Sequence, residues 1–135
     1  MIEYKHIKDF EEAQIKTLFK SVEWFSGDFP EKIRLALHNS SKVISAWDND
    51  TLIGLIRGLD DGIWQASIDC LLVHPDYQGK GIASTLLKQL VTEYENFLYI
   101  VVVPDEKRNI TFYEKNGFTI MSEGTPLQIR GKAWI

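Results

Sequence analysis

The sequence predicts an α/β (α+β) fold, with a mixed and mostly antiparallel sheet of about seven strands flanked by about four helices. Short runs of alternating apolar residues, separated by turn-forming clusters, indicate most of the strands. Between them, apolar residues at helical spacing indicate the helices. A strand, helix, strand passage makes two central strands parallel within the otherwise antiparallel sheet.

The first part of the chain predicts one strand and two helices. IEYKHI alternates like a short strand, and Asp9 then opens an amphipathic helix with Glu12 as its capping-box partner. Pro30 suits the first turn of a second, shorter helix through IRLALH.

The middle of the chain predicts an antiparallel meander followed by the crossover. KVISAW and TLIGLIRGL flank DND as a hairpin, and DDG turns the chain into WQASIDCLLV. An amphipathic helix then runs from about residue 82 to about residue 94. FLYIVVV is apolar on both parities and predicts a strand covered on both faces.

The last part of the chain predicts a helix and a closing hairpin. KRNITFYEKNG is a helix that ends at Gly117, which suits a left-handed cap, and FTIM and PLQIRG form the last two strands. With 135 residues, of which 44% are apolar, residues 1–135 are expected to form a single domain.

The composition limits the partners of the protein. The formal net charge of −4 argues against a general nucleic-acid or anionic-membrane surface, because both need a basic face. CLLV and FLYIVVV are far shorter than the roughly 20 apolar residues that span a bilayer, and IEYKHI is unlike a signal peptide. We therefore expect a cytoplasmic protein with no nucleic-acid or membrane partner.

The single cysteine and the histidines indicate little chemistry by themselves. Cys70 has no disulfide partner in the chain, and in its apolar run a small buried hydrophobe is favoured over a catalytic thiol. His6 and His38 have no companions at metal-ligand spacing, so we expect no metal site.

The stretch VHPDYQGKGIAS lies where an apolar strand passes into a helix. The first turn of a helix has backbone N–H groups without intrahelical partners, and Gly79 and Gly81 would let an anion approach them, with Lys80 adding positive charge. The loop is either such a cradle or a flexible turn. GxxxxGK[ST] is absent and Ser84 interrupts GxGxxG, which argues against a nucleotide hydrolase or a dehydrogenase.

Two motifs together carry a family resemblance. Gln78-Gly79-Lys80-Gly81-Ile82-Ala83 matches the Q/R-x-x-G-x-G/A signature of the GNAT superfamily of N-acetyltransferases, and LLVHPDY is a typical lead-in to it. Downstream, ITFYEKNGF is similar to the family segment that contains a recurrent tyrosine. The chain resembles the family over about residues 42–122. The resemblance implies the GNAT fold, whose two central parallel strands splay apart, and acetyl-CoA as the acetyl donor.

The resemblance also implies where the donor binds. The pantetheine arm would pair with the backbone of Leu71 and Val73, while Leu72 packs behind. The pyrophosphate would bind at the loop, and the residues so assigned are Gln78, Gly79, Lys80, Gly81, Ile82, Ala83 and Ser84. The chain departs from the family helix pattern N-x-x-A-I-x-x-Y, because Glu106 replaces the cofactor-contacting Asn. Asn109 either recovers that contact or caps a shortened helix.

Acetyl transfer to an amine needs a base for the amine and an acid for the departing thiolate. The resemblance makes Tyr113 the candidate acid, and a core aromatic is its alternative role. Asp69 is the candidate base, because a carboxylate within SIDCLLV is costly to bury unless it is paired or useful. A structural bond to a neighbouring strand or loop is the alternative for Asp69. Glu23 and His74 are weaker base candidates.

The resemblance places the acceptor between the first helical hairpin and the end of the sheet. Glu23 or Asp28 would draw a cationic amine there, and an apolar wall would be formed by Trp24, Phe25, Phe29 and Trp64, unless these rings only cover the core. The expected reaction is acetyl transfer to a primary amine of a small molecule, with peptide N-termini and aminoglycosides left open. A non-catalytic acyl-CoA-binding sensor or an interaction module is the rival class, and a homodimer through an edge strand also stays open.

Overall fold

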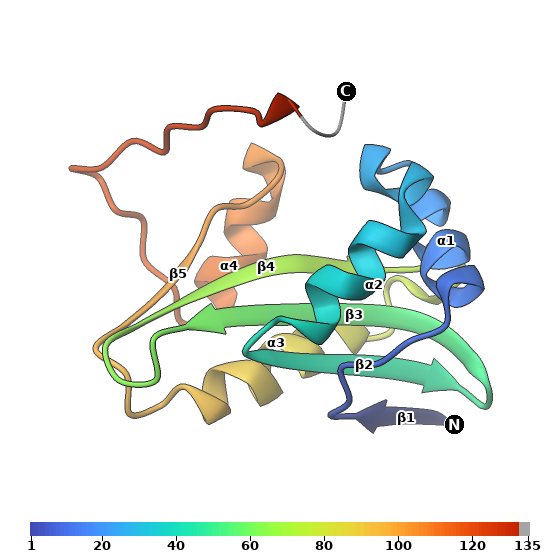
Figure 1. Cartoon of the computed structure of the whole chain (residues 1–135). Coiled ribbons are helices and arrows are strands. Elements are labelled where there is room, and N and C mark those ends of the chain that lie inside the picture. Colours follow the sequence, from blue (N-terminus) through green and yellow to red (C-terminus); the bar gives the residue numbers. More distant parts are fainter. Residues whose placement is uncertain (133–135) are drawn as a thin grey trace. The chain divides into compact units, whose positions relative to one another are not determined.

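The computed structural model describes residues 1–132, and the chain divides into two compact units, Met1–Val102 and Val103–Ile135. The first unit contains the strands β1 (Ile2–Lys5), β2 (Lys42–Asp48), β3 (Thr51–Asp60), β4 (Gln65–Val73) and β5 (Tyr99–Val102) (Figure 1). It also contains the helices α1 (Glu12–Ser21), α2 (Pro30–His38) and α3 (Ile82–Glu93), and the 3-10 turns η1 (Phe25–Asp28) and η2 (Pro75–Tyr77). The second unit contains η3 (Lys107–Asn109) and α4 (Ile110–Lys115).

The strands form one sheet in the order β1-β2-β3-β4-β5. Neighbours are antiparallel from β1 to β4, and β4 and β5 are parallel, as expected for the meander and the crossover. The parallel pairing ends where Ile68 lies beside Val102, although β4 continues to Val73. The last part of β4 therefore has an edge with which β5 does not pair.

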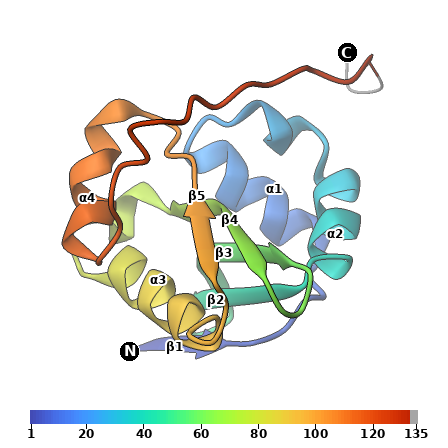
Figure 2. The same cartoon turned by 90° about the vertical axis from the view of Figure 1, so that its left-hand side faces the viewer.

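Helices cover both faces of this sheet: α1 and α2 lie on one face and α3 on the other (Figure 2). Ile15 and Leu18 of α1 and Leu86 of α3 are fully buried in the resulting core. Gly54 of β3 lies close under α3, because a Cβ there would come within 3.3 Å of Leu86. No helix within residues 1–132 combines the length and the apolarity needed to cross a membrane.

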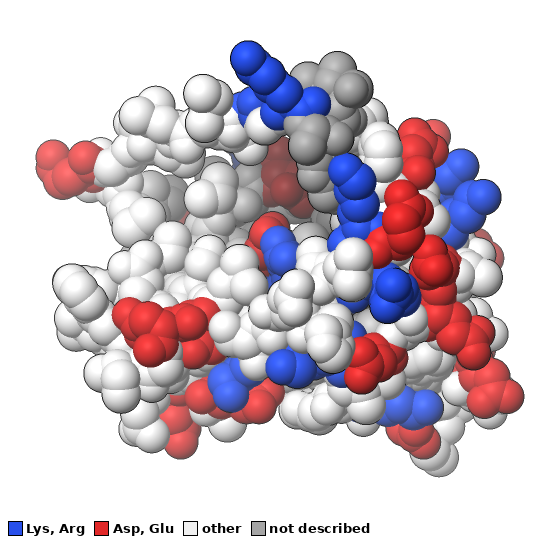
Figure 3. All heavy atoms as spheres, viewed as in Figure 1, with Lys and Arg blue, Asp and Glu red and all other residues white. Residues whose placement is uncertain are grey.

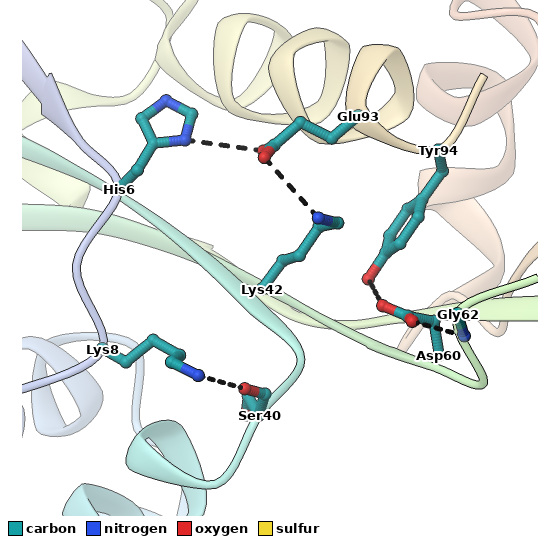
Figure 4. A network of polar contacts seen from close by, with 8 residues as sticks. All are labelled: His6, Lys8, Ser40, Lys42, Asp60, Gly62, Glu93 and Tyr94. Atoms are coloured by element: carbon teal, nitrogen blue, oxygen red, sulfur yellow. Dashed lines mark hydrogen bonds and ion pairs between the residues drawn. The ribbon is translucent and has the colours of Figure 1, made fainter. Parts of the chain in front are cut away.

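A polar network fastens the end of α3 to the sheet (Figure 4). The Tyr94 hydroxyl donates to Asp60 Oδ2 (2.8 Å), and Asp60 Oδ1 accepts the backbone N–H of Gly62 (2.8 Å). Burial and this carboxylate raise the pKa of Tyr94, so the phenol stays a donor. Beside it, Glu93 lies 3.5 Å from His6 Nδ1. The network fixes the turn between β3 and β4 to the C-terminal end of α3.

Within residues 1–132 the sheet has five strands, fewer than the seven or so that the sequence predicts. FTIM and PLQIRG, the expected closing hairpin, have no strand in the structure, and β5 is the last strand of the sheet. Leu98 and Tyr99, at the start of β5, are 66% and 56% exposed, so the expected burial on both faces is wrong there.

The helix ends agree with the sequence in part. Pro30 is at the start of α2, and Gly117 (φ +95°) follows α4 in the left-handed conformation, both as expected. The capping box is wrong, because α1 begins at Glu12 and has no side-chain cap. The Asp9 carboxylate instead pairs with His38 Nδ1 at 2.7 Å. The Asp9 side chain, which the local pattern assigns to the start of the helix, is instead in a hydrogen bond with a residue distant in the sequence.

Gly58→Ala is expected to lower the free energy of unfolding by about 2–3 kcal/mol, because its Cβ would overpack the core. That Cβ would lie 2.3 Å from the hydroxyl of Tyr94 and 2.8 Å from its ring. Urea unfolding followed by circular dichroism measures the loss. Gly124→Ala is the matched control, since a Cβ there meets no atom within 4 Å. Equal midpoints for the two variants would contradict the close packing of Tyr94 on β3.

Candidate active site

The loop between β4 and α3 is shaped by two glycines in the left-handed conformation. Gly79 has φ +79° and Gly81 has φ +81°. A Cβ built on either residue meets no atom within 4 Å. The glycines are therefore required by backbone conformation and not by tight packing, and the space beside them is open.

The start of α3 presents backbone donors without a capping side chain. Thr85 donates its N–H to the Gly81 carbonyl at 3.0 Å, and Gly81 itself precedes the helix as a residue without a side chain. The side chain of Ile82 is buried, and the first turn of α3 carries no acidic residue. The amides of Ile82 and Ala83 thus lie at the positive end of the helix dipole, where an anion is stabilised.

Two side chains of the loop are held by the protein itself. Gln78 Nε2 donates to the Val73 carbonyl at 2.9 Å. The side chain that is expected to contact acetyl-CoA therefore holds the loop against β4. The Tyr77 hydroxyl donates to the carboxylate of Asp48 at the end of β2, and this bond raises the pKa of Tyr77. Lys80 Nζ lies 5.3 Å from the centre of the Tyr77 ring.

His74, a weaker base candidate, takes a turn role. Its Nδ1 accepts the backbone N–H of Asp76 at 3.1 Å. Its own backbone N–H donates to the Ile53 carbonyl of β3 at 2.8 Å. Because backbone groups alternate along a strand, the N–H of Val73 points to the other edge of β4, where β5 has ended.

A β-bulge interrupts β4 before that edge. Cys70 and Leu71 together face a single residue of β3, and Cys70 has φ +56°. The left-handed conformation of a non-glycine residue costs roughly 1–2 kcal/mol. The flanking partners are Asp69 with Arg57 and Leu72 with Leu55.

The bulge changes which side chains share a face. Directly opposite residues of an antiparallel pair lie on the same face, so Asp69 and Leu72 share the face of Arg57. Val73 pairs with Gly54 and lies on the α3 side. Simple alternation along β4 would put Asp69 and Val73 on the same face, and the bulge places them on opposite faces. Leu72 is buried, in agreement with its expected packing role.

Asp69 is not the buried carboxylate that its apolar neighbours indicate. Its side chain is 54% exposed, and Oδ2 accepts a hydrogen bond from Arg57 Nη2 at 2.6 Å. Oδ1 accepts the N–H of Cys70 at 2.9 Å. Burial alone would lower the pKa of Arg57, but Cys70 and Asp69 outweigh it and the pKa is raised. Cys70 is half-buried and not fully buried as expected.

The expected acceptor residues follow α1. Glu23 is exposed with φ +60°, and it ends α1 as a Schellman motif, with Trp24 N–H bonded to the Phe19 carbonyl at 3.3 Å. The Trp24 ring packs edge-on against Phe19, which is the core-cover role. Phe25 is 49% exposed. Trp64 precedes β4 and so lies at the opposite end of that strand from the glycine loop.

Tyr113 and Asn109 belong to the second unit. The Tyr113 ring packs edge-on against Phe112 and Phe118, with ring centres 5.1 and 5.7 Å away. Asn109 immediately precedes α4, but its side chain makes no capping bond, so the capping alternative is wrong. Glu106 forms an ion pair with Arg108 at 2.5 Å.

Sequence reasoning missed Arg57 and Asp48. Arg57 is the cation within TLIGLIRGL, and this interruption of an apolar strand signals a partner on the next strand. Asp48 ends a strand and gives no comparable signal. Within residues 1–132 no three His, Cys, Asp or Glu side chains gather as a metal site would require. On the face seen in Figure 3, acidic and basic side chains are interspersed.

The mixed sheet, the edge of β4 that β5 leaves and the glycine loop before α3 are the arrangement that the sequence resemblance to acetyltransferases implies. The model of the acetyltransferase (GNAT) family matches residues 7–118, so the chain belongs to that family. The resemblance seen in the sequence motifs is thereby confirmed. The match extends from the first unit into the second.

Relatives and solved structures agree with this assignment. An uncharacterized N-acetyltransferase, ycf52, of Pyropia yezoensis is 29% identical over 98% of this chain and 79% of its own length. The histone acetyltransferase TAP1 of Glycine max is 29% identical over 73% of this chain but 42% of its own length. A GNAT acetyltransferase structure from Streptococcus pneumoniae superposes with a TM-score of 0.83 at 27% identity, covering 98% of this chain and 99% of that chain.

Glu23→Gly is expected to raise the free energy of unfolding by about 0.5–1 kcal/mol, because glycine adopts the left-handed conformation without steric cost. Thermal unfolding measures the gain. Glu23→Ala removes the same carboxylate but keeps a Cβ, so it should give no such gain. Equal effects of the two variants would assign the change to the carboxylate and not to the backbone.

Proposed function

We propose that this enzyme transfers the acetyl group of acetyl-CoA to a primary amine of a small molecule. The observation that carries the proposal is the pair of left-handed glycines, Gly79 and Gly81, opening α3 beside free space. Backbone amides at a helix start are suited to a diphosphate, which is the anionic group of the donor.

The donor would lie along the loop and the unpaired edge of β4. The amides from Gly79 to Ser84 would bind the pyrophosphate, with Lys80 adding charge at the rim. The N–H of Val73 lies on the strand edge that a pantetheine amide could pair with, and Leu71 is the second backbone candidate. Gln78 would support acetyl-CoA binding indirectly, by holding the Val73 carbonyl at this edge through its hydrogen bond. Asn109 remains a proposed contact of the donor.

The acceptor would bind at the segment that follows α1. Glu23 is exposed and would attract the ammonium form of an amine, and the half-exposed ring of Phe25 would contact its carbon chain. Trp24 would support this segment from its place against Phe19. A carboxylate beside exposed aromatic surface favours a compact cationic molecule over an anionic one.

The reaction needs no covalent acetyl-enzyme. The neutral amine nitrogen attacks the thioester carbonyl, a C–N bond forms, and the C–S bond breaks. The departing thiolate takes a proton from the Tyr113 hydroxyl. The proton lost by the amine passes to a base or to a chain of water molecules, for which Asp69 is one candidate.

The remaining expectations concern location and partners. We expect a cytoplasmic enzyme that needs no nucleic acid or membrane, and a homodimer through an edge strand stays open. A chain that bound acyl-CoA without turnover on any amine would be a sensor. The family membership favours the enzyme.

Calorimetry is expected to show one acetyl-CoA bound per chain, and Gly81→Glu is expected to weaken binding at least about tenfold. The new side chain would fill the space beside the loop and repel the diphosphate from the helix end. Gly62→Glu is the matched control, because Gly62 is also left-handed (φ +86°) with open space, at the other end of β4. No binding by folded wild-type protein would reject the donor assignment.

Tyr113→Phe is expected to lower kcat by about 10²- to 10⁴-fold while leaving acetyl-CoA affinity nearly unchanged, because only the proton donor is lost. Steady-state kinetics with an amine that the wild type acetylates gives kcat, and calorimetry gives the affinity. Tyr99→Phe removes the hydroxyl of an exposed tyrosine and serves as the control. An unchanged kcat would remove Tyr113 from the mechanism.

A further inference from the structure

We propose that Arg57 and Asp69 are positioning residues that hold the Cys70–Leu71 bulge in β4, and that Asp69 acts through the backbone and not as a base. The inference rests on the proposed function, because its consequence is the geometry of the acetyl-CoA edge of β4. It removes Asp69 from the base candidates and leaves proton removal to another group or to water.

The two oxygens of the Asp69 carboxylate have separate partners. Oδ1 accepts the N–H of Cys70 at 2.9 Å, and this amide belongs to the first residue of the bulge. Oδ2 accepts from Arg57 Nη2 at 2.6 Å, and Arg57 is the cross-strand partner of Asp69 on β3. The carboxylate therefore connects the bulge to the adjacent strand through two bonds.

Several costly features meet at this one place. Cys70 adopts a left-handed conformation that a β-carbon disfavours. Arg57 is only 17% exposed, and its Nε is buried without a hydrogen-bond partner among the described residues. An apolar cross-strand pair would avoid the cost of burying this charge. Local costs that coincide in this way are typical of functional sites, where they define a particular backbone geometry.

The bulge decides what β4 presents after it. Removing it would shift the pairing of β4 with β3 by one residue, which exchanges the faces of Leu72 and Val73. The same shift would turn the Val73 N–H from the unpaired edge toward β3. The Arg57–Asp69 pair thereby selects the backbone groups that are offered to the pantetheine arm.

The test uses acetyl-CoA affinity by calorimetry, because it needs no known acceptor. Asp69→Ala is expected to weaken binding about tenfold, since the amide of Cys70 loses its acceptor. Asp69→Asn keeps an oxygen for that amide and should bind within about threefold of wild type. Cys70→Gly added to Asp69→Ala should restore most of the affinity, because glycine holds the left-handed bulge without help.

A base role gives a different pattern. A general base contacts the amine, so Asp69→Ala would then leave acetyl-CoA affinity unchanged and Cys70→Gly would have nothing to restore. An unchanged acetyl-CoA affinity of Asp69→Ala would overturn the proposal, and so would a loss of affinity that Cys70→Gly does not restore. If Asp69→Ala does not fold, Asp69→Val removes the same acceptor from the Cys70 amide with a residue suited to a strand, and the same loss and the same rescue by Cys70→Gly are expected. Failure of the wild type to bind acetyl-CoA would instead reject the donor assignment.

Discussion

The backbone of β4 must find hydrogen-bond partners after β5 leaves it, and the site depends on this constraint. The parallel ladder stops at Ile68, but β4 continues to Val73 before the chain turns into the glycine loop. Buried backbone groups are rarely left unpaired. The loop supplies one of these partners, because the Gln78 side chain donates a hydrogen bond to the Val73 carbonyl. The edge that remains is a strand-like recognition surface attached to the start of a helix, which suits a long ligand with amides and a terminal diphosphate.

The position of α3 follows from small residues in β3. Gly54 lets the helix lie close on the sheet, and Tyr94 reaches from the end of α3 to Asp60. The loop before α3 is fastened separately through Tyr77 to Asp48. Both ends of the helix are thus connected to the sheet by side chains. A binding loop held at a rigid helix end loses little conformational freedom when it binds a ligand.

The sequence predicts what depends on near neighbours. Alternation and turn residues predicted β2, β3 and β4, and helical spacing predicted α3. The glycine loop could be recognised from the sequence because its residues are contiguous. Long-range partners explain the failures. Asp9 pairs with His38 in place of capping α1. Asp69 pairs with Arg57 on the adjacent strand, so the apolar residues beside Asp69 in the sequence wrongly indicate a buried carboxylate. The bulge at Cys70 has no local signature, since a cysteine rarely adopts a left-handed conformation. The closing hairpin fails because apolar alternation cannot supply a missing partner strand.

The contact between Gly58 and Tyr94 also bears on how the sequence can diversify. A side chain at position 58 and a large ring at position 94 exclude each other, because the space above β3 holds only one of them. The ring also carries the hydroxyl that binds Asp60, so exchanging the ring for a smaller residue releases that carboxylate as well. Positions 58, 60 and 94 are therefore physically coupled through the Tyr94 side chain, and the effect of a substitution at one of them depends on the residues at the other two.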